Sequence, residues 1–563
     1  MNALPVLPAL SAEDRKQLFW FLWLAFFILA AGYGLREPWP SDEPRFVLVA
    51  KHMVDSGNYL FPHRGIQLYS DKPPVFFWLL AACYQLIGSW RWSFLLPSLL
   101  SGMTVLYLGY DLGRRLWTPR TGIWMATAIL FSFQFVYQFK RAQIDPVLVL
   151  FTTIALYGFI RHLLLGPQWR WFYAGCFFAG LGIITKGVGF LPLLIFIPYI
   201  ALRFAKADGL AVQTDNNGLR WSSGLVFFLV AMAIWLVPLL WTVSQGGSAE
   251  QQAYLNDILF RQTAERYANP WVHRQPFWYF AEIMLLFWMP FSLAFFWLWK
   301  PWYKSLQIKD AKVLLPLAWA MLVVIFFSLS SGKRDMYILP ALPAFALAAA
   351  PFMQAMSERA SFRYALFTLI TLISVVMLVL GLQALLGEPG FEKKFILERG
   401  ASQLDSLWRM LIAVGGISLV ASLFFRHKKP LHSCLVFFVL VWSGYSFVVY
   451  PVLDGASSSK DLMLRARELA GADATIGLVD WKEQNLLQAQ GETTDFGFLE
   501  SPTRQLQKGI AWLKVSPAKR RLLLQSSKQT QCIDFKNADA ISLGNANRRS
   551  WWLIGEQATT ACR

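Results

Sequence analysis

The chain has 563 residues, of which 56% are hydrophobic and 15% are charged. It contains repeated apolar stretches of roughly 17–25 residues, each long enough to cross a bilayer. The net charge of +18 could point to nucleic acid, but in so apolar a chain it is better explained by Lys and Arg beside anionic membrane lipid. The composition therefore predicts a polytopic α-helical membrane protein and excludes a nucleic-acid partner.

Apolar segments recur along the chain, and their lengths decide which of them can span a membrane. They fall near residues 17–35, 74–88, 93–111, 121–139, 146–163, 170–185, 187–205, 222–245, 277–299, 313–329, 337–356, 363–386, 407–425 and 433–450. The segment 74–88 has only about fifteen residues and starts at a proline, so it is short for a span. We predict that it is a juxtamembrane or re-entrant helix and that the others form about 13 transmembrane helices.

The positions of Lys and Arg predict the orientation, because cytoplasmic loops carry an excess of both. With 74–88 left out of the count, the basic clusters between spans fall on the same side as Arg15 and Lys16. The N-terminus is therefore predicted to be cytoplasmic. The opposite side receives a first external loop, 36–92, a second large loop, 246–276, and everything after Tyr450.

The polar tail differs from the rest of the chain. Residues 460–469 have a helix-like pattern, and strand-like patterns occur at 474–479, 520–524 and 551–554. We predict a transmembrane domain over residues 1–453 and a small soluble α/β domain over residues 454–563. Cys532 and Cys562 of this tail could form a disulfide outside the cytoplasm, but the sequence does not supply the geometry and the pairing stays open.

Acidic and basic residues are concentrated in the first external loop. Asp42, Glu43 and Arg45 lie near its start, and Asp71 and Lys72 precede two prolines. Such a loop offers a carboxylate to accept a proton and cations to hold a departing phosphate, which glycosyl transfer from a lipid-phosphate donor needs. A structural alternative stays open, since Asp42 and Glu43 could cap a helix and Asp71 and Lys72 could form an interfacial ion pair.

Ionisable residues in later segments share that side of the membrane. Asp145 precedes Pro146 at the start of a predicted span, where it could act chemically or serve as an N-cap. Charged residues alternate with aromatic rings around Arg266 and His273, a pattern that suits phosphate and sugar recognition as well as a plain aromatic belt.

A polar turn between two later spans contains Lys333, Arg334 and Tyr337. Its adjacent cations could bind phosphate, or they could reach the lipid headgroups. Both interpretations stay open.

These motifs, in this order, resemble a known family. They are the acidic pair 42–43, Tyr69-x-Asp71-Lys72-Pro73-Pro74, Asp145 before a span, the loop from Glu265-Arg266 to Tyr279, and the turn from Lys333 to Pro340. The set resembles the bacterial 4-amino-4-deoxy-L-arabinose (lipid A) transferase and protein O-mannosyltransferase-like family of the glycosyltransferase C superfamily. The resemblance covers roughly residues 15–450 and implies the same arrangement of spans with an external C-terminal domain.

The resemblance implies inverting transfer of a sugar, aminoarabinose-like or a hexose, from a polyprenyl-phosphate donor. The implied acceptor is lipid A or another surface glycolipid, at the periplasmic face of the bacterial inner membrane. Two alternatives stay open. One is transfer from the same donor class to a protein hydroxyl, and the other is binding or transport of polyprenyl phosphates without chemistry.

The motifs also imply residue roles. Asp42 would be the general base or would position the acceptor, Asp145 would be a second acidic group, and Lys72 would meet the leaving phosphate. The residues implied to bind phosphate or sugar are Glu43, Arg45, Tyr69, Asp71, Arg266, Lys333, Arg334 and Tyr337. The chain departs from the family at Asp71, where Glu is usual, and no motif matches beyond Asp454.

The sequence contains no recognisable metal motif, because neither CxxC nor HExxH spacing occurs. Lys72 with Arg45, Arg266 or Lys333 could neutralise the leaving phosphate, so we predict that no cofactor is required. A divalent metal bound by Asp71 and His273 is the alternative that the family suggests.

Overall fold

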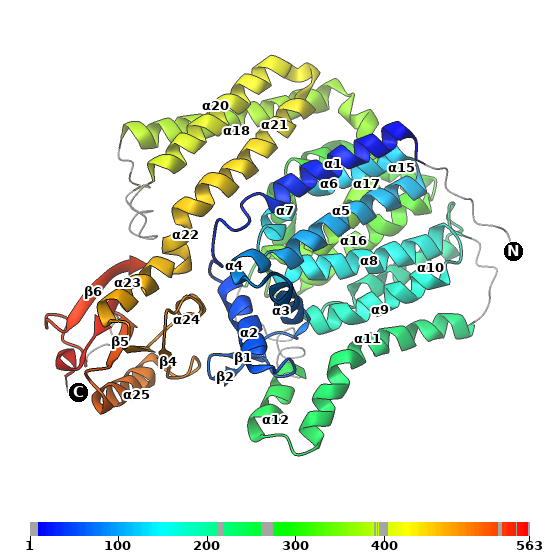
Figure 1. Cartoon of the computed structure of the whole chain (residues 1–563). Coiled ribbons are helices and arrows are strands. Elements are labelled where there is room, and N and C mark those ends of the chain that lie inside the picture. Colours follow the sequence, from blue (N-terminus) through cyan, green and yellow to red (C-terminus); the bar gives the residue numbers. More distant parts are fainter. Residues whose placement is uncertain are drawn as a thin grey trace.

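Figure 1 shows the computed structural model of the chain, a large helical body with a small sheet near its C-terminal end. The structure describes all residues except 1–9, 212–217, 260–273, 388–389, 391, 393–403, 527–531, 548 and 561–563.

The helical body is built from segments that stay apolar over the thickness of a bilayer. Among the described residues, eight helical stretches are long and apolar enough to cross a membrane: α4–α5 (Trp90–Leu116), α8 (Ile144–Leu164), α11 (Gly218–Ser244), α16 (Ala311–Leu329), η4–α17 (Asp335–Ser357), α18 (Ala360–Leu386), α20–η5 (Asp405–Lys428) and α21–α22 (Pro430–Ser458). The chain is therefore a multi-span membrane protein, as predicted. The predicted number of spans stays a prediction.

Further helices complete the body. They are α1 (Ala12–Ala30), α3 (Val75–Ile87), α6 (Pro119–Leu130), α7 (Phe133–Phe139), α9 (Trp169–Lys186), α10 (Phe196–Phe204), α12 (Ala249–Asn256), α14 (Tyr279–Phe287) and α15 (Phe295–Gln307). The segment predicted to be too short for a span is α3, with 13 residues. The largest apolar core extends through the body from Ala25 in α1 to Trp442 in α21. In Figure 1, α18, α20 and α21 form a separate layer beside the other helices.

Two segments that are continuous in the sequence are broken in the structure at neighbouring points. One break separates α6 from α7 at Phe131 and Ser132. The other separates α14 from α15 at Pro290, which has no backbone N–H to donate. The breaks face each other, because the Phe133 N–H donates to the Met289 carbonyl at 3.0 Å. Such irregular backbone is tolerated at membrane depth where protein groups satisfy it.

The first loop, residues 36–92, which is predicted to be external, folds against the start of α8. Its elements are α2 (Glu43–Ser56), the hairpin of β1 (His63–Arg64) and β2 (Gln67–Leu68), α3 and α4 (Trp90–Ser93). Val47, Ala50 and Met53 on α2 are fully buried in an apolar cluster that also contains Val147 of α8. This packing fixes the polar start of α2 relative to the helical body.

The C-terminal region forms a five-stranded sheet with strand order β4-β3-β5-β7-β6. β3 (Thr475–Leu478) is parallel to β4 (Thr493–Asp495) and β5 (Arg520–Gln525), whereas β7 (Arg549–Ile554) is antiparallel to β5 and to β6 (Ala540–Ala546). The helices of this region are α23 (Lys460–Ala470), α24 (Glu483–Leu487) and α25 (Pro502–Val515). Leu522 and Leu523 enter different apolar clusters, because successive side chains of a strand point to opposite faces.

The helix predicted at 460–469 is found as α23, and the three predicted strands are found as β3, β5 and β7. The last helix of the body continues to Ser458 as α22 (Tyr450–Ser458), so the predicted domain boundary after residue 453 lies inside it. Cys532 is part of a disulfide, and Cys562 lies outside the described residues.

Candidate functional site

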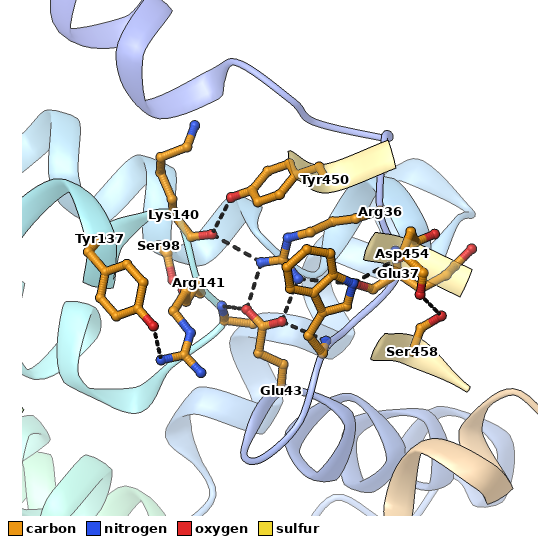
Figure 2. A network of polar contacts seen from close by, with 12 residues as sticks. Arg36, Glu37, Glu43, Ser98, Tyr137, Lys140, Arg141, Tyr450, Asp454 and Ser458 are labelled. Atoms are coloured by element: carbon orange, nitrogen blue, oxygen red, sulfur yellow. Dashed lines mark hydrogen bonds and ion pairs between the residues drawn. The ribbon is translucent and has the colours of Figure 1, made fainter. Parts of the chain in front are cut away.

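A buried ion pair holds the start of the first external loop (Figure 2). The Arg36 and Glu43 side chains are 2% and 1% exposed, and Arg36 Nη2 donates to Glu43 Oε1 at 2.8 Å. Glu43 also accepts from the backbone N–H groups of Trp39 at 2.8 Å and Ala142 at 2.9 Å. Burial alone would raise the pKa of Glu43, but the guanidinium of Arg36 offsets this and holds the pKa below its usual value. Glu43 is thus fixed by protein donors.

The same pair is joined to two distant parts of the chain. Arg36 Nη2 donates to the Lys140 carbonyl at 3.1 Å, and its guanidinium lies 4.8 Å from the centroid of the Tyr450 ring. The Glu37 N–H donates to Asp454 Oδ1 at 2.7 Å. The start of the first loop, the connection between α7 and α8, and α22 therefore meet at Arg36, as Figure 2 shows.

Asp42 is the N-cap residue of α2, and the structure describes every residue of this helix. The Asp42 side chain nevertheless makes no capping hydrogen bond to the helix backbone. Its carboxylate, 11% exposed, lies 3.5 Å from Arg45 Nη1 and 3.8 Å from Arg334 Nη2. The capping alternative is therefore wrong for the Asp42 side chain. Instead, the carboxylate faces two cations from different parts of the chain.

Arg45 is shared between Asp42 and the C-terminal region. Its Nε donates to Oε1 of Glu483, in α24, at 2.8 Å. Arg64 of the hairpin approaches the same oxygen at 3.4 Å, and its guanidinium lies 5.3 Å from the centroid of the Tyr69 ring. Arg45 and Arg64 thus share Glu483 as a partner, and each also contacts a group of the first loop, Asp42 or Tyr69.

Tyr69, Asp71 and Lys72 lie between β2 and α3. Tyr69 is buried, whereas Asp71 and Lys72 are partly buried. Burial and, next, the negative charge of Asp71 raise the pKa of Tyr69, which places Asp71 near this ring. The phenol therefore keeps its proton at neutral pH.

Asp145 lies in the first turn of α8, and Gln143 is the N-cap residue of that helix. The predicted alternative of Asp145 as N-cap is therefore wrong. Its buried carboxylate pairs with Lys186 Nζ, at the end of α9, at 2.5 Å. Lys186 Nζ also lies 4.8 Å from the centroid of the Tyr337 ring. Asp145, Lys186 and Tyr337 form one contact group.

We expect Asp145→Asn to destabilise the folded chain by about 1–3 kcal/mol, because it leaves the mostly buried Lys186 ammonium without its counter-ion. The loss should appear as a lower Tm in detergent, followed by tryptophan fluorescence. Asp405→Asn is the matched control, since Asp405 pairs with Arg409 at 3.7 Å on an exposed surface. Equal Tm values for both variants would contradict the expectation.

The later polar turn contributes Lys333 and Arg334 in different ways. Arg334 faces Asp42, whereas the buried Lys333 donates from Nζ to the Gln275 carbonyl at 3.0 Å. Arg334 immediately precedes η4, the element that carries Tyr337. This turn therefore connects the surroundings of Asp42 with the contact group of Asp145.

Two predicted residues, Arg266 and His273, lie outside the described residues. The prediction of a metal bound by Asp71 and His273 therefore stays a prediction. Within the part of the chain that the structure describes, no three His, Cys, Asp or Glu side chains are grouped so that they could hold a metal ion.

We define the first-loop site as Asp42, Arg45, Arg334, Asp145, Lys186 and Tyr337. Glu43 accepts a hydrogen bond from the N–H of Ala142, three residues before Asp145. The backbone of this short segment therefore links Glu43 to Asp145. Carboxylates can accept a proton, and the cations beside them can hold an anion such as phosphate. The arrangement thus suits a reaction in which a proton is removed while an anion departs.

Sequence reasoning did not single out Arg36, Lys186 or Glu483 as site residues. Lys186 carries a usable signal, since it is a cation at the end of an apolar segment. Arg36 and Glu483 carry none, because their importance depends on partners that lie elsewhere in the chain.

Comparisons with known proteins find relatives of this chain in sequence and in fold. The family model described as dolichyl-phosphate-mannose-protein mannosyltransferase matches residues 71–241. An undecaprenyl phosphate-alpha-4-amino-4-deoxy-L-arabinose arabinosyl transferase from Pseudomonas savastanoi pv. phaseolicola is 29% identical over 338 residues, 58% of this chain and 59% of that protein. A protein of the same name from Pseudomonas aeruginosa is 28% identical over 354 residues, 59% of each chain. The chain thus spans about three fifths of the length of these relatives.

Solved structures with the same fold extend the likeness to nearly the whole chain. The crystal structure of ArnT from Cupriavidus metallidurans bound to undecaprenyl phosphate matches with a TM-score of 0.73 at 17% identity, covering 96% of this chain and 98% of ArnT. Its apo structure matches with a TM-score of 0.71 at 16% identity, covering 98% and 100%. The fold is therefore that of ArnT. Together with the sequence matches, this confirms the predicted resemblance to the aminoarabinose transferase and O-mannosyltransferase-like family.

Proposed function

We propose that this chain, which shares the fold of ArnT, is an inverting glycosyltransferase that moves a sugar from a polyprenyl-phosphate donor to lipid A or another surface glycolipid. Its relatives are named as arabinosyl transferases of undecaprenyl phosphate-linked aminoarabinose, and ArnT has been solved with undecaprenyl phosphate bound. Both observations support a long lipid-phosphate carrier as the donor.

The observation that carries the proposal is the position of Asp42 between Arg45 and Arg334. Transfer requires a carboxylate that can accept the proton of an acceptor hydroxyl, together with cations that can hold the leaving phosphate. The first-loop site brings both kinds of group within 4 Å of each other.

In the proposed reaction, the acceptor hydroxyl attacks the anomeric carbon on the face opposite the phosphate. The bond between that carbon and the phosphate oxygen breaks, and the phosphate leaves with the electron pair while the hydroxyl proton passes to Asp42. Lys72, Arg45 and Arg334 would neutralise the charge that develops on the phosphate.

We propose supporting roles for three further residues, Glu43, Asp145 and Tyr69. We assign Glu43 to positioning, since its carboxylate already accepts from Arg36, Trp39 and Ala142. Asp145, paired with Lys186, would be the second acidic group of the site. Tyr69, whose phenol keeps its proton, would donate a hydrogen bond to phosphate or sugar.

We propose that no resident metal is needed, because the positive side chains of the site can stabilise the charge of an anionic leaving group. The alternative in the proposal is a divalent ion shared by Asp71 and His273. That ion would stabilise charge on the phosphate when bound.

We also propose the membrane arrangement. The first external loop and the C-terminal region contact each other through Arg45 and Glu483, which supports placing both on one side. The distribution of Lys and Arg supports a cytoplasmic N-terminus, about 13 spans, and a soluble domain over 454–563 on the periplasmic side of a bacterial inner membrane.

The second candidate function is transfer to a protein hydroxyl, and the description of the matching family model favours it. The transport alternative has less support. The carboxylates and cations of the first-loop site gather in the first loop, at the ends of α8 and α9 and just before η4, whereas a carrier pathway needs polar groups along its length.

Mass spectrometry of lipid A and surface glycans tests the function, with cells that have or lack this chain. We expect the deletion to remove one sugar-sized mass from lipid A or another glycolipid, and the wild-type gene to restore it. A loss from glycoproteins alone would move the assignment to the second candidate. Unchanged glycolipids and glycoproteins would overturn transfer and leave transport as the better reading.

A further inference from the structure

We propose that the C-terminal region supplies a positioning residue to the first-loop site: Glu483, which orients Arg45 beside Asp42. The inference rests on the proposed function, because its consequence is a rate of transfer. It concerns a part of the chain in which the sequence shows no family motif.

The contact itself is close and shielded from water. The Glu483 side chain is 5% exposed, and its Oε1 lies 2.8 Å from Arg45 Nε and 3.4 Å from Arg64 Nη1. Glu483 is the first residue of α24. Buried, charge-assisted bonds of this kind hold a guanidinium in one orientation.

The contact is part of a wider docking surface between the C-terminal region and the first loop. At the end of β4, Asp495 accepts from the backbone of the hairpin turn. A Cβ on Gly65 in that turn would meet Asp495 at 2.8 Å. The Leu499 N–H donates to Gln67 Oε1 at 2.9 Å, and Leu48 of α2 is buried in a cluster with the sheet. The position of Glu483 is therefore set by a surface and not by one flexible side chain.

The two carboxylates compete for Arg45. Because Glu483 occupies Nε, only an Nη group of Arg45 faces Asp42, at 3.5 Å. Without Glu483, the guanidinium could turn and bond Asp42 through two parallel hydrogen bonds. Such a pair would occupy the oxygens that have to accept the proton. Glu483 thus holds Arg45 close to Asp42 and prevents its guanidinium from forming two hydrogen bonds with the Asp42 carboxylate.

Glu483→Gln tests the inference, because it keeps the size of the side chain and removes its charge. We expect kcat for transfer to fall by about 10-fold or more, while the donor KM changes by less than about 3-fold. Glu500→Gln is the matched control, since Glu500 pairs with Lys508 at 2.9 Å on the surface of the same region. The control should keep the wild-type kcat and Tm. Glu483→Gln should lower the Tm, because it removes the counter-ion that the mostly buried Arg45 and Arg64 share, so kcat is measured well below the Tm of every variant.

A double-mutant cycle separates positioning from mere structural support. If Glu483 acts through Arg45, Glu483→Gln should cost little more in kcat when Arg45→Gln is already present. Losses that multiply would show that Glu483 acts independently of Arg45, and would overturn the inference.

The outcomes distinguish this inference from the proposed function. Wild-type kcat for Glu483→Gln, alongside an inactive Asp42→Asn variant, would overturn only the positioning role. Absence of transfer by the wild-type chain would overturn the proposed function. Hydrogen exchange at residues 63–68 of the wild type would then test the docking contact, and rapid exchange there would overturn it.

Discussion

Asp42→Asn is expected to lower kcat for sugar transfer by about 10²–10⁴, with little change in the donor KM. Asparagine has the same shape but cannot accept the proton of the acceptor hydroxyl. The Asp42 side chain makes no capping bond within α2, so its replacement should leave the helix intact. The measurement is steady-state transfer by the purified protein from a polyprenyl-phosphate sugar to lipid A.

The matched control is Asp55→Asn, at the other end of the same helix. Asp55 pairs with Lys51 at 2.7 Å, and both side chains are exposed, so this change should not alter kcat or Tm. Wild-type turnover in the Asp42→Asn variant would refute its role as base. Loss of turnover in Asp145→Asn alone would transfer that role to Asp145.

The sequence drew attention to the first loop for a physical reason. Charges are rare in a chain of this composition, so the concentration of Asp42, Arg45 and Lys72 in one loop is a strong signal. The same reasoning found Arg334, which the structure brings to within 3.8 Å of Asp42 from nearly 300 residues further along the chain. What the pattern could not show is which charge pairs with which.

The sequence could not predict roles that depend on contacts with residues far away in the chain. Asp145 was expected as an N-cap or a chemical group, and only the structure shows that its counter-ion is Lys186. Likewise, Glu43 looks like any acidic residue at the start of a helix until Arg36 and Ala142 are seen beside it. The break at Ser132 was also hidden, because nothing in that apolar segment resembles the proline of its partner break.

The Arg36–Glu43 pair is expected to have the largest effect on stability. Glu43→Gln leaves the Arg36 guanidinium buried and uncompensated, which should cost about 3–5 kcal/mol of unfolding free energy. Denaturant unfolding in detergent at neutral pH measures the loss. Asp55→Asn serves again as the control on α2, and a loss no larger than that of the control would contradict the expectation.

The pH dependence of this loss has a definite sign. Because the folded-state pKa of Glu43 is lowered, the pair contributes its stability above the ordinary Glu pKa of about 4.3 and loses it as the pH falls through the folded value. Glu43→Gln has no such titration. The stability difference between the wild type and this variant should therefore narrow as the pH falls below about 4. A difference that stays constant on acidification would contradict the assignment.

The double variant Arg36→Met with Glu43→Leu separates stability from alignment. Apolar side chains of similar volume can replace a buried ion pair at little cost, but here the N–H groups of Trp39 and Ala142 lose their acceptor. The unfolding free energy should therefore recover part of the loss seen in Glu43→Gln and stay below that of the wild type. Transfer should nevertheless stay low, because the hydrogen bonds from Arg36 to Lys140 and from Ala142 to Glu43 are lost. These bonds tie the residue next to Asp42 to the segment before Asp145. A double variant that is both stable and fully active would show that the pair only stabilises the loop and does not align the carboxylates.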